Sequence, residues 1–289
     1  MCHVCRFGPA LVAVGCIALA GCVAPPKEGS AGAESATLSV KGSDTMVQLA
    51  QAWAEAFMKA RPDVRVSVTG GGSNTGFTAL ISKGADVANA SRAIKPEETE
   101  SAARKGVTPK EFVVAQDALS VIVNKANPIT ELTLAQLKDI YTAKVTNWKD
   151  VGGSDTPIVL NARESSSGTS TFFQEHVLGK GVPYAATAML QPATSQIVAG
   201  VAEDAGAIGY VGLGYLNGSV KAVRLKKDAA SDAVAPSIDN VVNGTYALAR
   251  PLFEYTNGEP AGAVKIWLDW VRGPEGQAIV KKLDFVPAQ

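Results

Sequence analysis

Four short segments of the sequence combine small hydroxyl residues with glycine or arginine, and each follows a run with the pattern of a β-strand. They are GSDT (42–45), GGGSNTG (70–76), NASR (89–92) and RESSSGT (163–169). Serine and threonine hydroxyls are neutral hydrogen-bond donors, and glycine lets the backbone approach a ligand closely. Arg92 and Arg163 add positive charge and forked donors. Donors of this kind, without a cluster of metal ligands, predict a site for an oxyanion.

The same segments fit two kinds of catalytic site poorly. GGSNTGF (71–77) has the glycine spacing of a P-loop, but Phe77 stands where the lysine of that motif belongs. It also departs from the G-x-S-x-G nucleophile elbow, because residue 75 is threonine. Beyond the N-terminal segment, His176 is the one histidine, which argues against a zinc site and against a Ser-His-Asp hydrolase. We therefore expect a binding protein and not an enzyme, without metal or other cofactor; an envelope phosphohydrolase is the least favoured alternative.

Alternating strand-like and helical runs predict where the hydroxyl-rich segments lie. Strand-like runs cover 37–42, 64–72, 85–91, 112–124, 157–164 and 207–213, and helical runs cover 45–60, 77–84, 133–144, 168–179 and 262–283. This alternation predicts an α/β fold with mostly parallel sheets. In such sheets ligands bind at the carboxyl ends of strands, where helix N-termini present free N–H groups and a partial positive charge. We expect the four segments to meet at such an edge.

The N-terminal segment indicates the compartment. Arg6 precedes an apolar run that is too short to span a membrane and has the shape of a secretory signal, which predicts a signal peptide over residues 1–21. The following LAGC (19–22) resembles the lipobox of bacterial lipoproteins, and that resemblance implies cleavage before Cys22 and a lipid on its sulfur. Residues 22–36 are expected to be a flexible tether, because they are rich in Pro, Gly, Ser and Ala. We therefore expect a protein of the cell envelope, anchored by lipid to a membrane and facing the periplasm or the exterior.

Composition narrows the remaining chemistry and the partners. The four cysteines, Cys2, Cys5, Cys16 and Cys22, all lie in the segment to be removed or at the lipidation site. The folded part is therefore expected to have neither a disulfide nor a thiolate metal site. The chain has 27 basic and 27 acidic residues and no basic run, so we expect no nucleic-acid partner.

Three longer segments resemble a known family. GSDTMVQLAQAWAEAF (42–57), VTGGGSNTGFTALISKGADVANASRAIKPEE (68–98) and RESSSGTSTFFQEHVL (163–178) look like the phosphate-binding proteins of bacterial phosphate ABC transporters, in the periplasmic binding protein superfamily. The likeness is closest to their shorter, lipoprotein-type branch. It implies a two-lobed fold of type II, in which each lobe is a mixed, mostly parallel sheet flanked by helices. Two crossovers would join the lobes, with residues 37–117 and 240–289 in one lobe and residues 118–239 in the other.

The same resemblance implies a function and a set of contacts. The lobes would close over one inorganic phosphate, and the protein, expected to be a monomer, would deliver it to the permease subunits of an ABC transporter. The implied phosphate contacts are Ser43, Thr45, Ser73, Ser91, Arg163, Ser167, Gly168 and Thr169.

The sequence departs from the best-known members of this family at two acidic positions. Those members carry an aspartate directly after the serine that matches Ser91, and it accepts a proton from the ligand. They carry another aspartate two residues after the arginine that matches Arg163. Here the two positions hold Arg92 and Ser165. Without these aspartates, another oxyanion such as sulfate, molybdate or a phosphonate remains an alternative ligand.

The missing proton acceptor must then be sought elsewhere. Asp44 is our candidate, and the alternative for this residue is a helix N-cap that does not contact the ligand. Glu164 is a weaker candidate, and Asp86 is expected to cap or pair at the start of the third strand. We include Asp44 and Arg92 in the expected phosphate site.

Overall fold

A computed structural model describes residues 36–288 of the chain. These residues belong to one compact unit, Ser35–Gln289. The predicted signal peptide, Cys22 and nearly all of the predicted tether lie outside the described residues. In the described part, no helix is both long and apolar enough to span a bilayer.

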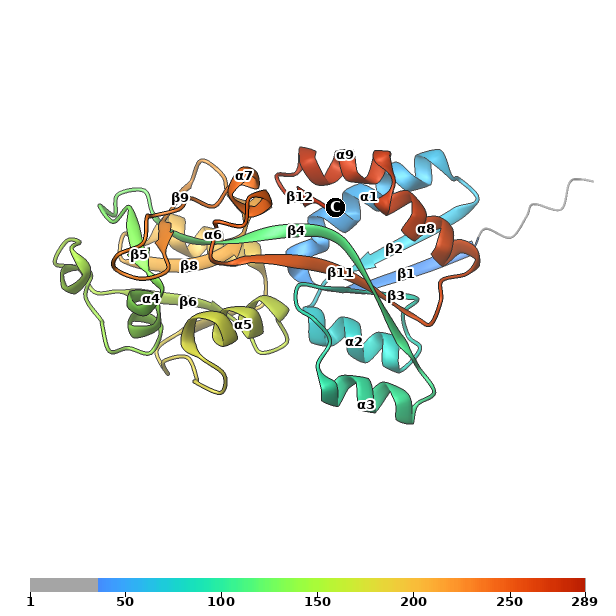
Figure 1. The fold of residues 1–289 in the computed structure, drawn as a ribbon, viewed down its shortest axis with the longest axis horizontal. Coiled ribbons are helices and arrows are strands. Elements are labelled where there is room, and N and C mark those ends of the chain that lie inside the picture. Colours follow the sequence, from blue (N-terminus) through green and yellow to red (C-terminus); the bar gives the residue numbers. More distant parts are fainter. Residues whose placement is uncertain (1–35, 289) are drawn as a thin grey trace, which may run out of the picture. The chain divides into compact units, whose positions relative to one another are not determined.

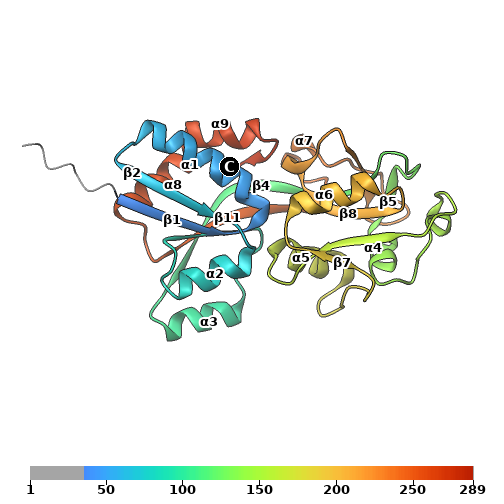
Figure 2. The same cartoon turned by 180° about the vertical axis from the view of Figure 1, so that it is seen from behind.

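One half of the fold, here called the first lobe, is built on the parallel sheet β2–β1–β3, to which β11 is added in antiparallel orientation. Its strands are β1 (Ala36–Gly42), β2 (Val64–Thr69), β3 (Val87–Ala90) and β11 (Ala249–Asn257). One face is covered by α1 (Val47–Ala60), α8 (Gly262–Arg272) and α9 (Pro274–Lys282), and the other by α2 (Ser73–Ile81) and α3 (Pro96–Arg104) (Figures 1 and 2).

Helix α1 shows why these residues fold as they do. Within the helical run predicted over residues 45–60, Met46, just before α1, and Ala50, Trp53 and Phe57 recur at helical spacing and are completely buried. The indole N–H of Trp53 donates to the carbonyl of Gly276 at 2.8 Å, which ties α1 to α9. The helix ends at Ala60, shortly before Pro62, which cannot continue it.

The other half, here called the second lobe, is built on β4, β8, β6 and β7 in that order. β8 is antiparallel to β4, whereas β6 and β7 continue in parallel. The strands are β4 (Pro109–Asn124), β6 (Val159–Arg163), β7 (Met189–Gln191), β8 (Ala207–Gly212) and β9 (Val220–Ala222). The helices are α4 (Leu134–Tyr141), α5 (Gly168–Phe173), α6 (Thr194–Glu203) and α7 (Ile238–Val242).

Short elements complete the two lobes. β5 (Glu131–Thr133) pairs with β10 (Arg224–Lys226), and β12 (Val286–Pro287) pairs with β4. The 3₁₀ turns are η1 (Asp44–Met46), η2 (Trp148–Val151) and η4 (Leu213–Tyr215), and α5 runs on into a π-helical turn, η3 (Gln174–Leu178). The α/β architecture with mixed sheets is as the sequence predicted.

Two strands run between the lobes. β4 contributes Val114 and Ala115 to the core under α1 and α8, and Leu119 and Val121 to the core of the second lobe. β11 lies antiparallel beside it over the residues 249–257, which is visible in both views (Figures 1 and 2). The chain therefore leaves the first lobe along β4 and returns along β11.

The packing differs from the expected lobe boundary at residue 240. Val241, Tyr246 and Leu248 lie in the core of the second lobe. The return passage is therefore β11, about ten residues later along the chain than expected. The reason is that α7 has only five residues, so the segment before β11 carries no periodic pattern to mark its packing.

Candidate functional site

Each of the four hydroxyl-rich segments begins where a strand ends. β1, β2 and β3 are parallel, so their carboxyl ends lie along one edge of the first lobe's sheet. β6 ends at Arg163 in the second lobe, and the segment that follows leads into α5. Hydrogen bonds between the segments bring this edge and the start of α5 together.

Four side-chain hydroxyls form a continuous buried chain, here called the hydroxyl cluster: Thr45, Thr169, Ser91 and Ser73. The Oγ1 atoms of Thr45 and Thr169 lie 2.6 Å apart, and Oγ1 of Thr169 lies 3.4 Å from Oγ of Ser91. Oγ of Ser73 lies 3.4 Å from Oγ of Ser91 and accepts the Ser91 N–H at 3.0 Å. The cluster therefore joins three segments of the first lobe to α5 of the second.

Gly168 allows α5 to approach the cluster this closely. A Cβ atom at this position would overlap Oγ of Ser73 and would lie 2.9 Å from Oγ of Ser91. The first N–H groups of a helix have no partner within the helix, and the helix start carries a partial positive charge. The start of α5, together with that of α2 at Ser73, therefore adds backbone donors beside the hydroxyls.

Ser43 and Ser167, two further predicted contacts, lie two residues before Thr45 and Thr169 in the sequence. Ser43 is buried, its N–H donates to the Asn89 carbonyl at 2.8 Å, and its hydroxyl has no hydrogen-bond partner in the described part of the chain. Ser167 caps α5, because its Oγ accepts the N–H of Ser170 at 3.3 Å. Ser167 thus holds the helix start in place, and its own hydroxyl proton is still available to a ligand.

Arg163 lies at the edge of the site, with only 1% of its side chain exposed. Nε donates to the Gln191 carbonyl at 3.1 Å, Nη1 to Oγ1 of Thr194 at 2.7 Å, and Nη2 to the Pro192 carbonyl at 2.7 Å. Within residues 36–288, none of these bonds goes to the hydroxyl cluster. The guanidinium is instead held along the connection from β7 to α6.

Asp44 lies beside Arg163 and reaches from the first lobe to the second. Its Oδ2 accepts both the N–H and the hydroxyl of Thr194 at 2.7 Å and lies 3.2 Å from Nη1 of Arg163. Its backbone carbonyl accepts the hydroxyl of Tyr215 at 2.8 Å. Asp44 is therefore engaged with the second lobe through both its side chain and its backbone.

Arg92 follows Ser91 directly, but its side chain turns toward α3. Nη1 and Nη2 bind the two carboxylate oxygens of Glu98 at 2.8 and 2.6 Å, and the guanidinium carbon lies 4.9 Å from the centre of the Phe77 ring. Nη2 also donates to Oδ1 of Asn74 at 2.5 Å. The charge of Arg92 is thus paired beside the hydroxyl cluster.

Several residues that organise this site were not among the predicted contacts. Asn74 binds across the lobes, since its N–H donates to the Ser166 carbonyl at 3.1 Å and its amide nitrogen to the Ser165 carbonyl at 3.0 Å. Thr194 has no local signal, because its partner lies 150 residues earlier in the chain. A signal for Asp117 did exist: a carboxylate inside an otherwise apolar strand must find a partner, which here is Arg250.

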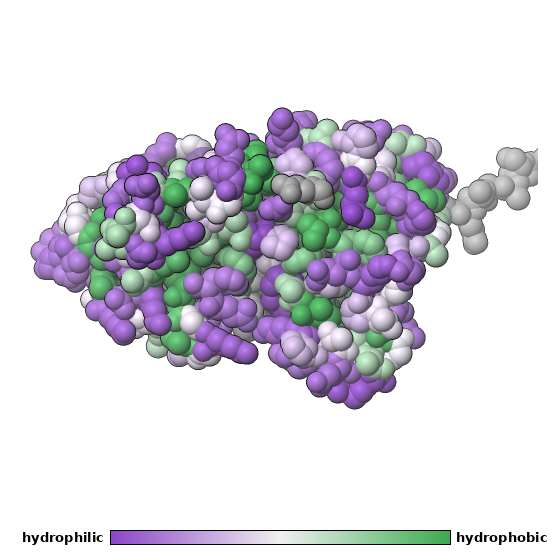
Figure 3. Space-filling view, viewed as in Figure 1, coloured by the Kyte–Doolittle hydropathy of each residue, from purple (hydrophilic) through white to green (hydrophobic). Residues whose placement is uncertain are grey.

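Hollows in the surface lie at both ends of β3 in the first lobe. One of about 360 Å³ borders the hydroxyl cluster and is lined by residues of both lobes, among them Ser91, Lys95, Phe172 and His176. The space-filling view shows the face hollowed where the lobes adjoin below β11 (Figure 3). The predicted phosphate site and this hollow thus share Ser91 and Arg92.

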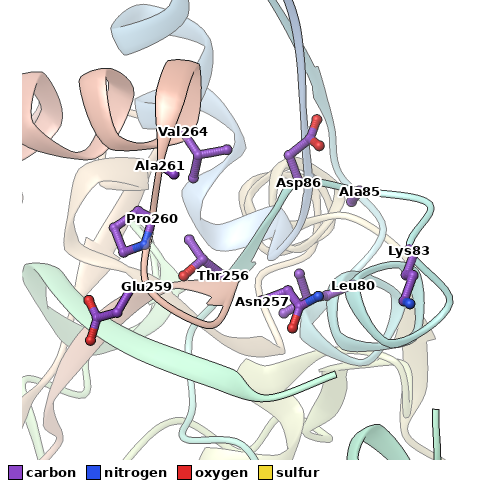
Figure 4. A pocket seen from close by; sticks show the side chains of 10 residues that line it. All are labelled: Leu80, Lys83, Ala85, Asp86, Thr256, Asn257, Glu259, Pro260, Ala261 and Val264. Atoms are coloured by element: carbon purple, nitrogen blue, oxygen red, sulfur yellow. The ribbon is translucent and has the colours of Figure 1, made fainter. Parts of the chain in front are cut away.

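A separate hollow of about 340 Å³ lies at the opposite ends of the first lobe's parallel strands (Figure 4). Asp86 borders it and accepts the Ser39 N–H at 2.7 Å, in agreement with a pairing role at the start of β3. None of the four hydroxyl-rich segments lines this hollow, so it is not part of the candidate site. Among residues 36–288, no group of three or more His, Cys, Asp or Glu is arranged to hold a metal ion.

Comparison with known proteins places the chain in a family. A model of the PBP superfamily domain matches residues 28–275. Protein SphX of Synechococcus elongatus is 37% identical, over 93% of this chain and 82% of that protein. The phosphate-binding protein PstS of Pseudomonas aeruginosa is 34% identical, over 91% of this chain and 86% of that protein.

A solved structure gives the same result. It is a putative phosphate ABC transporter substrate-binding protein from Clostridium perfringens with bound phosphate, which superposes with a TM-score of 0.81 at 33% identity. The alignment covers 88% of this chain and all of that one. The chain therefore belongs to the PBP superfamily, in the family of the phosphate-binding proteins with which its sequence aligns.

Proposed function

We propose that this chain captures inorganic phosphate between its two lobes and delivers it to the permease of an ABC transporter, without chemical turnover. The observation that carries the proposal is the hydroxyl cluster, in which donors from both lobes meet beside two helix starts. The relatives named as phosphate-binding proteins support the choice of ligand. The proposed contacts are Ser43, Thr45, Ser73, Ser91, Ser167, Gly168 and Thr169.

The cluster suits a tetrahedral anion because each hydroxyl can turn. Hydroxyls that now bond to one another would rotate toward phosphate oxygens, and hydrogen bonds to a charged acceptor are roughly twice as strong as neutral ones. A hydroxyl oxygen can also accept a hydrogen bond from a protonated oxygen of the ligand. The cluster can therefore serve a phosphate that still carries a hydrogen.

The anion would interact mainly with the dipoles of hydroxyl and backbone N–H groups, and much less with net positive charge. Each of three buried arginines near the cluster is paired with a carboxylate: Arg92 with Glu98, Arg163 with Asp44, and Arg250 with Asp117. Arg92 and Arg163, both expected as ligand contacts, would then act mainly by holding the loops in position. A direct bond from Arg163 is still open to it, because only three of its five N–H groups donate in the hydrogen bonds described above.

We propose a lipid-anchored location and a division into lobes on the same basis. Cys22 would carry the lipid, so that the chain faces the periplasm or the exterior and meets the permease subunits as a monomer. One lobe would contain residues 37–117 together with the chain from residue 249, where β11 begins, onward. The other lobe would contain the residues between these two segments. The separate hydrophobic cores on either side of β4 and β11 support this division.

Another oxyanion is the second candidate ligand. The observation that favours it is that no carboxylate is hydrogen-bonded to the hydroxyl cluster within residues 36–288. A site made only of hydroxyls and N–H groups has no fixed acceptor that would repel the fully deprotonated sulfate.

Calorimetry tests both candidates. The mature chain from residue 22, with Cys22→Ser for solubility, is stripped of ligand and titrated with phosphate, arsenate, sulfate, molybdate and methylphosphonate. We expect phosphate to bind most tightly, and Thr169→Val to weaken it while Thr130→Val, at an exposed position, does not. Tighter binding of another anion would replace phosphate as the ligand, and no binding of any anion would refute the proposal.

A further inference from the structure

We infer that Asp44 is a positioning residue that fastens the two lobes together, and not the acceptor of the ligand's proton. Its carboxylate would set the affinity for an anion by stabilising the closed arrangement of the lobes. This inference rests on the proposed function only in taking phosphate as the test ligand.

One oxygen of the Asp44 carboxylate, Oδ2, already interacts with three donor groups. Oδ2 of Asp44 accepts the Thr194 N–H and the Thr194 hydroxyl, each at 2.7 Å, and lies 3.2 Å from Nη1 of Arg163. A carboxylate oxygen offers about two lone-pair sites. Oδ2 is therefore fully used, and accepting a ligand proton there would break a bond between the lobes.

The other oxygen of the Asp44 carboxylate, Oδ1, is not hydrogen-bonded to the hydroxyl cluster either. Oδ1 lies on the side of Gly70, where a Cβ atom would be 3.7 Å from Oδ1 and 3.5 Å from Cγ2 of Val47. None of the hydrogen bonds of the hydroxyl cluster includes either oxygen of Asp44. The carboxylate thus serves the junction between the lobes, next to the cluster.

Asp44 supplies a hydrogen-bond acceptor that the second lobe does not itself provide at the start of α6. Helix α6 begins at Thr194, and its own N-cap residue is Ala193, which has no side-chain acceptor. Asp44, from the other lobe, accepts the N–H of Thr194, one of the first N–H groups of the helix that have no partner within it, and adds a negative charge at the helix start. The same oxygen lies beside Arg163, whose Nε and Nη2 are fixed to the carbonyls of the β7–α6 connection.

The contacts of Asp44 should stabilise the closed arrangement of the lobes relative to the open one. Separating the lobes would leave α6 without a cap and a nearly buried guanidinium without its carboxylate. The apparent dissociation constant equals the intrinsic one divided by the fraction of closed protein. Loss of Asp44 should therefore weaken every anion by the same factor.

Asp44→Asn tests this directly, because it keeps size and shape but removes the charge. We expect phosphate, arsenate and sulfate each to bind several-fold more weakly: losing one charge-assisted hydrogen bond between the lobes costs about tenfold in affinity, and the uncompensated charge of Arg163 offsets part of that loss. The ratio of phosphate to sulfate affinity should stay within about twofold of wild type. A ratio that collapses by about tenfold or more would instead identify Asp44 as the proton acceptor, and unchanged affinities would also overturn the inference.

A second measurement needs no ligand at all. Spin labels at Glu100→Cys in the first lobe and Lys180→Cys in the second, both exposed, report the distance between lobes in a mature chain in which Cys22→Ser leaves no other cysteine. We expect ligand-free Asp44→Asn and Thr194→Val to populate longer distances than wild type, whereas Thr194→Ser, which keeps the hydroxyl, should match it. Identical distance distributions in all four proteins would refute the role of Asp44 even if phosphate binds.

The two measurements separate this inference from the proposed function. If wild type binds no phosphate, the proposed function fails while the distance measurement still decides the role of Asp44. If Asp44→Asn does not fold, Thr194→Val and Thr194→Ser carry the comparison of affinities in its place.

Discussion

Asp117 and Arg250 face each other as a buried ion pair across the two strands that run between the lobes, with Oδ2 2.8 Å from Nη2. Arg250 also donates to the Ser91 carbonyl at 3.2 Å, and the Leu213 N–H donates to Oδ1 of Asp117 at 2.9 Å. The Arg250 guanidinium carbon lies 5.3 Å from the centre of the Phe172 ring. The pair thus connects β4 and β11 to the hydroxyl cluster and to the second lobe.

Removing one partner of this pair should destabilise the fold strongly. In Arg250→Met the Asp117 carboxylate stays buried without its countercharge, which typically costs about 3–5 kcal/mol of unfolding free energy. Urea unfolding of the mature chain measures the loss. Lys265→Met is the control, because it breaks an exposed pair with Asp269 and should cost less than about 1 kcal/mol. Equal losses in the two variants would contradict a structural role for the buried pair.

Glu254 should make stability fall as pH rises. Burial raises the pKa of Glu254 to about 8, and the hydrogen bond from the Trp267 indole lowers it by less than burial raises it. Oε1 has no partner in the described residues, and Glu254 is the register partner of Asn89 across β11 and β3. The folded chain then binds a proton that the unfolded chain releases at its ordinary, lower pKa.

Because the pKa of Glu254 is higher in the folded chain than in the unfolded chain, its protonation stabilises the fold at low pH. The stabilisation from protonated Glu254 is full below about pH 4.5, is lost progressively up to about pH 8, and does not change further above that. Urea unfolding free energies of wild type and Glu254→Gln should therefore diverge over this range, with Gln favoured at high pH by up to about 5 kcal/mol. A constant difference across the range would show that Glu254 titrates normally.

Local patterns allowed the prediction of those elements whose side chains repeat at a regular spacing. Helix α1, which lies within the helical run predicted over residues 45–60, is of this kind. β11 was missed because ARPLFEYTN contains a proline and two charged residues, which contradict the pattern of a central strand. Arg250 and Glu254 are tolerated there only because Asp117 and Trp267 bind them.

The residue types of the hydroxyl cluster were predictable, whereas the pairings of the charged residues around it were not. The hydroxyls of Thr45, Ser73, Ser91 and Thr169 meet because each follows a strand end, which the strand pattern indicated. The partners of charged groups depend on tertiary contacts instead. No local signal in the chain shows that Asp44 would reach Thr194, or that Arg92 would turn to Glu98.

Gly168→Ala should abolish tight anion binding. The new Cβ would overlap Oγ of Ser73 in the closed arrangement, so α5 could no longer meet the cluster. We expect the affinity for phosphate to fall by at least about tenfold in calorimetry, as for the loss of one or more charge-assisted hydrogen bonds. Gly218→Ala is the matched control, because a Cβ there has no atom within 4 Å. Wild-type affinity in Gly168→Ala would remove the start of α5 from the site.

Phosphate affinity should depend little on ionic strength. Because Arg92 is paired with Glu98 beside Ser91, the site should present little net charge to the ligand. Phosphate affinity of wild type should then change by less than about threefold between about 20 and about 500 mM salt, over which the screening length shrinks several-fold.

Glu98→Gln tests the cause of this insensitivity. The substitution leaves the Arg92 charge uncompensated while preserving an acceptor for its N–H groups and for the Lys95 N–H. An unpaired charge near the ligand is worth about 1–2 kcal/mol at an effective dielectric constant of about 20, so affinity at low salt should rise about tenfold and decline as salt is added. Glu97→Gln removes a neighbouring exposed charge that forms no ion pair in the described structure, and it should leave the salt dependence flat. A steep salt dependence already present in wild type would mean that the ligand meets an arginine directly, and the paired guanidinium of Arg163 would be the first residue to test.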